Sequence, residues 1–259
     1  MEADLREIWA DRIRYNNFVF KATISADPIL NAKDCINVVV IYEDYCRLAF
    51  IRLNKLKTLH GLMLTTYVDN RWTLIREVVH TEDKFYAMNR WSQLLSFDIT
   101  AQSNLNVKLV GHKISGTKFM QRYLVYSTEK KLLMVDRYCF YEKVDGFSKR
   151  VTKEFKVFYF NFDRCEWTEK KTLGDVALFI GDNSSISVLA SNFSGCKPNC
   201  IYFNHDCDRI GKDFKHYNFA VYNVETGIVS QPYAKYANTL VNMANRPCIW
   251  IVPTFQASD

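Results

Sequence analysis

Short apolar and aromatic segments, separated by polar turns, recur along almost the whole chain and constrain its fold more than any other feature. The segments with clear strand character are Val38–Tyr42, Arg47–Leu53, Lys84–Ala87, Leu94–Ile99, Tyr123–Ser127, Lys131–Arg137, Phe155–Phe162, Glu166–Lys170, Ala177–Ile180, Ile186–Ala190, Cys200–Phe203, Phe219–Val224 and Ile249–Val252. β-Branched and aromatic residues favour strands, and many short strands at even spacing are typical of a sandwich, barrel or propeller. Helical spacing occurs in two segments, Glu2–Arg14 and Tyr233–Asn245. We therefore expect an all-β protein.

A loose repeat favours one of these all-β folds. Two apolar–aromatic strands around a polar turn recur in Lys84–Ile99, Phe155–Lys170 and Cys200–Gly227. Aromatic residues make up 15% of the chain, and they recur at matching places in FYAMN, FYFNF and IYFNH. In a kelch-like β-propeller such residues pack between neighbouring blades. The repeat predicts this fold, with short four-stranded blades.

Charge and hydropathy narrow the function classes. The 259 residues carry 34 basic and 28 acidic side chains, so the net charge is 34 − 28 = +6. No apolar run reaches the roughly 18 residues that span a bilayer, and the first residues lack the apolar core of a signal peptide. We expect no membrane partner and a location in the cytoplasm, the nucleus or both. The eight cysteines are then expected to be reduced thiols.

One stretch, Leu173–Phe203, carries a resemblance to a known family. It reads LGDVALFIGDNSSISVLASNFSGCKPNCIYF. This resembles the signature of a plant F-box-associated domain, formerly a domain of unknown function and now called the KIB-type β-propeller. The residues that match the signature are Leu173, Gly174, Asp175, Gly181, Asp182, Asn183, Gly195, Cys196, Lys197, Asn199, Cys200 and Tyr202. The resemblance implies a β-propeller without catalytic residues, cofactor or metal.

The resemblance also implies a function in protein binding. Family members resemble substrate receptors of SCF-type ubiquitin ligases, in which a three-helix F-box binds the Skp adaptor and the propeller binds the substrate. Here Phe18–Cys35 already resembles an early propeller segment, and residues 1–17 are too few for a three-helix module. We expect an N-terminal helical extension at 1–17, a propeller at 18–259, no F-box and no direct recruitment of Skp or cullin. Because the resemblance to the propeller begins with an early segment at Phe18, two forms of the propeller are possible, a closed ring of blades and an incomplete ring.

Several residue groups suggest other chemistry. Cys196, Cys200, His205 and Cys207 are the donor types of a zinc site, but their tight spacing at the start of an apolar strand favours ordinary buried thiols. Asp175 and Asp182 are candidates for a hydrolase with a central pocket, whereas Asp, Asn and Ser at these positions are also typical of tight turns. Basic loops suggest a nucleic-acid surface, but acidic or apolar residues lie close to each of them.

The tryptophans are the remaining candidates for a binding face. Trp72 and Trp167 lie in strand-like segments, so we expect them to pack in the core. Trp91 lies in a turn between two strands and is the best candidate for an exposed aromatic that contacts a partner. The sequence therefore predicts a protein-interaction module, with a hydrolase or a nucleic-acid-binding propeller as alternatives.

Overall fold

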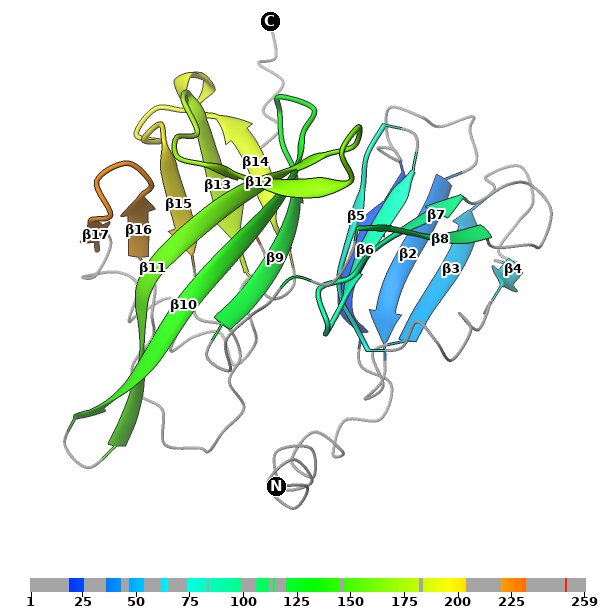
Figure 1. The fold of residues 1–259 in the computed structure, drawn as a ribbon, viewed down its shortest axis with the longest axis horizontal. Coiled ribbons are helices and arrows are strands. Elements are labelled where there is room, and N and C mark those ends of the chain that lie inside the picture. Colours follow the sequence, from blue (N-terminus) through cyan, green and yellow to red (C-terminus); the bar gives the residue numbers. More distant parts are fainter. Residues whose placement is uncertain are drawn as a thin grey trace, which may run out of the picture.

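The strands that the structure describes form four sheets that follow one another in sequence order (Figure 1). The computed structural model describes residues 19–25, 36–42, 47–53, 62–64, 74–82, 84–98, 106–111, 114, 120–144, 147–181, 184–203, 220–231 and 250. The predicted all-β propeller is confirmed, because the sheets form a four-bladed arrangement. Among the described residues the helical element is one 3-10 turn, η2 (Ala190–Asn192). No helix in these ranges is long and apolar enough to cross a membrane.

The first two sheets are antiparallel meanders in which each strand pairs with the next one in the chain. The first sheet contains β1 (Val19–Ile24), β2 (Ile36–Tyr42), β3 (Arg47–Leu53) and β4 (Leu62–Leu64). The second contains β5 (Ile75–His80), β6 (Phe85–Asn89), β7 (Leu94–Asp98) and β8 (Asn106–Gly111). In each sheet the spatial order equals the sequence order. This is the four-stranded blade that the repeat predicts.

The third sheet has the same order but much longer central strands. It contains β9 (Met120–Tyr126), β10 (Leu132–Val144), β11 (Phe147–Asn161) and β12 (Glu166–Lys170). The expected strands Lys131–Arg137 and Phe155–Phe162 were therefore too short, because β10 and β11 continue as a paired ribbon past the ends of β9 and β12. This ribbon projects at the lower left of the molecule (Figure 1).

The fourth sheet departs from the simple meander. It contains β13 (Val176–Ile180), β14 (Ile186–Leu189), β15 (Cys200–Phe203), β16 (Ala220–Asn223) and β17 (Val229–Ser230). Its spatial order is β14-β13-β15-β16-β17, and β13 pairs with β15 in parallel. The chain must therefore cross from one side of β13 to the other between β14 and β15. The signature segment makes this crossing.

Alternating side chains build a separate core between each pair of neighbouring sheets. In the central strand β6 every residue is buried. Phe85 and Ala87 pack against the first sheet, whereas Tyr86 and Met88 pack against the third. This is the period of two that a strand with two covered faces requires. A further core joins the third and fourth sheets, and the aromatics fill these seams as the sequence predicts.

A buried ion pair and a hydrogen bond to the same carboxylate join the innermost strands of the first three sheets. Lys21 of β1 contacts Glu77 of β5, with 2.6 Å between Nζ and Oε2, and both side chains are almost fully buried. The same Glu77 oxygen accepts a hydrogen bond of 3.0 Å from the backbone N–H of Leu124 in β9. Glu77 thus connects three blades through one carboxylate.

Some predictions concern segments outside the described residues. They include the helices Glu2–Arg14 and Tyr233–Asn245, the extension at 1–17 and, apart from Trp250, the strand Ile249–Val252. Within the described ranges, a shared core joins each sheet to the next in sequence, and none joins the fourth sheet to the first. The choice between a closed and an incomplete ring depends on segments outside these ranges.

Candidate protein-binding surface

The described residues of the signature segment hold the fourth sheet together. Leu173 is fully buried in the core between the third and fourth sheets. Gly174 and Gly195 have φ values of +62° and +82°, a backbone conformation that favours glycine. Gly181 is buried, and Asp182 and Asn183 lie outside the described residues. The described positions, Leu173, Gly174, Gly181 and Gly195, serve turns and packing.

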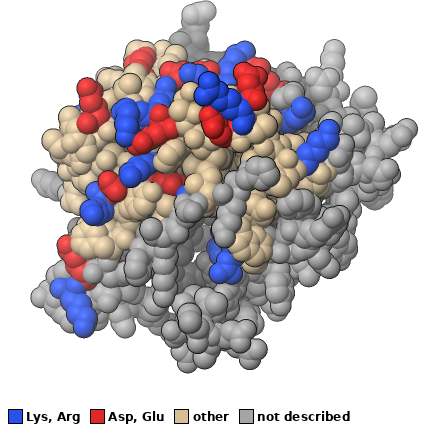
Figure 2. Space-filling model, in the orientation of Figure 1, with Lys and Arg blue, Asp and Glu red and all other residues tan. Residues whose placement is uncertain are grey.

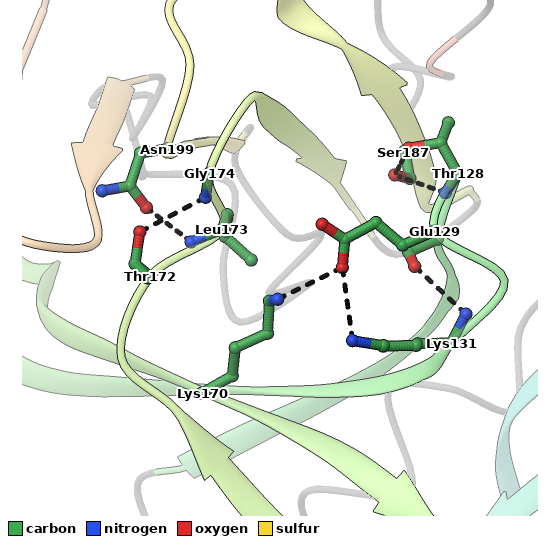
Figure 3. Close-up of polar contacts among 10 residues, drawn as sticks. Thr128, Glu129, Lys131, Lys170, Thr172, Leu173, Gly174, Ser187 and Asn199 are labelled. Carbon is green, nitrogen blue, oxygen red and sulfur yellow. Dashed lines mark hydrogen bonds and ion pairs between the residues drawn. The ribbon is translucent and has the colours of Figure 1, made fainter.

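Asn199 is the polar centre of this segment, directly before β15. Its Oδ1 accepts a hydrogen bond of 2.7 Å from the backbone N–H of Leu173 (Figure 3). Its Nδ2 donates to Glu225 over 3.3 Å. Its backbone N–H donates to Val176 and its carbonyl accepts from Val224. Asn199 has a φ of +57°, which Asn tolerates better than most residues. One residue thus connects the chain entering β13 with the chain leaving β16.

Asp175 has a local structural role. It is exposed, and its carboxylate accepts hydrogen bonds from the hydroxyl and the backbone N–H of Ser191, at 2.6 and 3.2 Å. Its own carbonyl accepts from the backbone N–H of Ala190. These bonds fix the start of η2 beside the start of β13. Asp175, offered above as a hydrolase candidate, is engaged in capping a turn.

The two signature cysteines in the described part are free thiols. Cys200 is buried, and Cys196 is half-buried beside Tyr202. Burial raises the pKa of both thiols, which keeps them protonated near neutral pH. No group of three or more His, Cys, Asp and Glu that could hold a metal occurs among the described residues. The other two members of the zinc candidate, His205 and Cys207, lie outside these ranges.

Tyr202 lies at the centre of the second core of the fourth sheet. Its ring stacks on Phe179 with 4.5 Å between centroids and 9° between planes. Its hydroxyl accepts a hydrogen bond of 2.8 Å from the backbone N–H of Lys197. Burial raises the pKa of Tyr202 to about 12, so the phenol remains protonated. The exposed Lys197 contributes its backbone, rather than its charge, to this contact.

The tryptophans divide between core and surface. Trp167 packs its ring against Phe160 at 5.0 Å. Trp250 packs against Phe179, and its indole N–H donates 2.9 Å to the carbonyl of Ile180. Trp91 is 40% exposed in the turn between β6 and β7. Trp72, expected in the core, lies outside the described residues.

Two buried carboxylates could suggest a catalytic pocket, but each has a cationic partner. Glu77 pairs with Lys21 as described above. Asp136 in β10 forms a two-pronged ion pair with Arg122 in β9, at 2.8 and 3.1 Å. Burial raises the pKa of Asp136, and the Arg122 guanidinium opposes the rise. Arg122 also contacts Ser92 and the carbonyl of Ile114, so this pair fastens the third sheet to the second.

Charges of both signs interleave along the upper edge of the face in Figure 2. Lys130 pairs with Glu82 at 2.6 Å, which joins the turns 81–84 and 127–131. Glu129 lies between Lys131 and Lys170, at 3.8 and 3.2 Å (Figure 3). A nucleic-acid surface presents a continuous excess of cations. Here Lys130, Lys131 and Lys170 are each paired with a glutamate, so these described basic residues form no continuous cationic surface. We call the turns 81–84, 127–131 and 162–165 the charged rim.

Phe162 is a surface aromatic that the sequence reasoning missed. It was expected at the end of a strand, but β11 ends at Asn161 and Phe162 begins the following turn. The Asn161 side chain accepts hydrogen bonds from the backbone N–H groups of Asp163 and Arg164, and so starts the turn one residue early. Phe162 is 47% exposed. The available signal was Asn161 two residues before Asp163, because an Asn side chain commonly accepts a hydrogen bond from the backbone two residues further on.

Comparison with known proteins agrees with this architecture. Sheets of four or five strands in sequence, with their innermost strands side by side, define a β-propeller. The family model described as the KIB1-4 beta-propeller matches residues 6–223. The chain belongs to this family. No solved structure matches the chain.

Similar curated proteins include F-box proteins of Arabidopsis thaliana. A putative F-box protein is 32% identical over 124 residues, 47% of this chain and 32% of the relative. A putative F-box/kelch-repeat protein is 25% identical over 177 residues, 61% of this chain and 46% of the relative. A probable F-box protein is 42% identical over 57 residues, 22% of this chain and 15% of the relative. The chain spans less than half the length of these relatives.

Proposed function

We propose that this chain is a protein-binding module of the kind that selects substrates for an SCF-type ubiquitin ligase, acting in the cytoplasm or the nucleus. The observation that carries this proposal is membership of the KIB1-4 beta-propeller family, in which the relatives found are F-box proteins. The described signature residues serve turns and packing inside the fourth sheet. The exposed turns at the ends of the blades are therefore the surface that supports partner binding in this proposal. Partner selection would then depend on side chains at the ends of the blades.

Binding requires no covalent step. A rigid propeller loses little conformational freedom on association, which favours affinity for a partner. Exposed aromatics such as Trp91 and Phe162 have the residue type that dominates protein interfaces. The charged turns around them contribute selectivity and association rate more than affinity.

Direct binding with purified proteins tests this proposal. The full chain is used to capture proteins from plant extract, and each candidate is then purified and titrated against the chain. We expect at least one partner that binds directly, and whose ubiquitination falls when the chain is depleted from cells. Failure of every purified candidate to bind would contradict a protein-binding function. A partner whose ubiquitination does not depend on the chain would contradict the ligase role alone.

A further inference from the structure

Phe162 is held rigidly in an exposed position. The turn that carries it is fixed by two hydrogen bonds to the Asn161 side chain, of 3.0 and 3.1 Å. Its ring contacts Phe160 at 5.0 Å, with 79° between the planes, and Tyr86 at 5.6 Å. Both of these rings are buried. A side chain that is already ordered loses little rotamer freedom when a partner covers it.

The position of Phe162 joins two blades. Phe160 belongs to β11 of the third sheet, and Tyr86 belongs to β6 of the second. Phe162 therefore covers the seam between these sheets at the charged rim. Trp91 follows the other end of β6, and the four residue steps from one end of this strand to the other span about 13 Å. The two exposed aromatics lie at opposite ends of the propeller.

The charges around Phe162 indicate what kind of partner fits. Arg164 lies in the same turn as Phe162, and its Nη1 is 3.6 Å from Oε1 of Glu166, the first residue of β12; both side chains are more than half exposed. Across the rim, Lys130 pairs with Glu82. A rim of both charge signs around an apolar centre is the usual anatomy of a protein interface. A nucleic acid or an anionic membrane would instead require an excess of cations.

We propose that Phe162 is the anchor of the partner-binding surface, and that it inserts into an apolar pocket on a folded protein partner whose border carries both acidic and basic groups. This inference rests on the proposed function and specifies its site. It places the partner at the end of the propeller formed by the charged rim, rather than at the end that carries Trp91.

Site-specific photo-crosslinking distinguishes the two ends. The full chain is prepared with p-benzoylphenylalanine at position 162 or, as the matched control, at position 91, and is irradiated in plant extract. Each crosslinked protein is identified, purified and titrated against the wild-type chain, Phe162→Ala, Phe162→Trp and Trp91→Ala. Thermal unfolding of each variant checks that the fold is intact.

We expect Phe162→Ala to weaken binding at least tenfold, Phe162→Trp to retain most of the affinity, and Trp91→Ala to change it less than threefold. A partner that loses affinity with Trp91→Ala but not with Phe162→Ala would overturn this site while leaving the proposed function intact. Crosslinking of position 162 to nucleic acid or lipid alone would overturn the partner class. If no purified protein binds the wild-type chain, the proposed function fails together with the site.

Discussion

The ion pair between Lys21 and Glu77 gives the sharpest test of how the blades are held together. Glu77→Gln keeps an oxygen that can accept the hydrogen bond from Leu124, but it leaves the Lys21 ammonium buried without its carboxylate. Lys21→Met leaves the Glu77 carboxylate buried without the ammonium group that it pairs with. Removing one partner of a buried pair costs about 3–5 kcal/mol, so each single variant is expected to lose that amount of unfolding free energy.

The double variant separates a coupled pair from two independent residues. With both charges gone, the remaining cost is that of imperfectly paired polar groups, about 1–3 kcal/mol. The double variant is therefore expected to be more stable than either single one. Urea unfolding followed by tryptophan fluorescence measures all four proteins. Because a domain has only about 5–15 kcal/mol of stability, Glu77→Asp provides a milder variant if Glu77→Gln does not fold.

An exposed ion pair on the same propeller is the matched control. Lys130 and Glu82 lie equally close, at 2.6 Å, but their side chains are 72% and 60% exposed. Lys130→Met is expected to leave the unfolding free energy unchanged within experimental error, because water screens the pair. If the Lys21 and Glu77 variants add to within about 0.5 kcal/mol, the residues are not coupled and the reasoning is refuted.

Three further predictions concern single residues. Asn199→Gly tolerates the positive φ but removes the partner of the buried Leu173 N–H, so it should lower the unfolding free energy in urea by about 1–3 kcal/mol. Asn199→Ala should lower it further, because Ala does not favour a positive φ. Equal losses for the two variants would refute the role of φ. Gly111→Ala places a Cβ 3.0 Å from the Phe160 ring and should lower stability by about 1–3 kcal/mol; an unchanged melting temperature would contradict this crowding. Burial raises the pKa of Tyr202 from 10.0 to about 12, so Tyr202 ionises in the unfolded chain before it ionises in the folded one. The free energy of unfolding should therefore fall between pH 10 and pH 12 by up to about 1.4 kcal/mol per pH unit. The unfolding free energy of Tyr202→Phe should fall less steeply with pH than that of the wild-type chain. Equal slopes for the two proteins would refute the raised pKa of Tyr202.

The sequence predicts strands well where apolar residues and turn signals agree. Arg47–Leu53, Glu166–Lys170 and Cys200–Phe203 were predicted with the bounds that β3, β12 and β15 have. β1 and β5 were not predicted. Each carries a charged residue, Lys21 or Glu77, that is buried in the structure. Only the contact between the two strands makes these charges compatible with the interior, and the two residues are far apart in the sequence.

The extension of β10 and β11 was missed for a related reason. Charged residues such as Glu142, Lys143 and Lys153 are frequent there, and this composition resembles a solvated loop. In the structure these three side chains are exposed, and the backbone pairs across the hairpin. Their charges therefore carry no desolvation cost that would exclude a strand.

The signature was the easiest part of the site to recognise, but its described residues act on the scaffold. Asn199 and Tyr202 form contacts within the fourth sheet, and Leu173 is buried in its core. Residues that point inward cannot distinguish one partner from another. Proteins with the same signature can therefore share this sheet and still bind different partners. Selectivity would depend on the turns at the ends of the blades, where Phe162 is 47% exposed on a rigid backing. Exchanging residues 162–165 between relatives should therefore change partner choice without changing the fold.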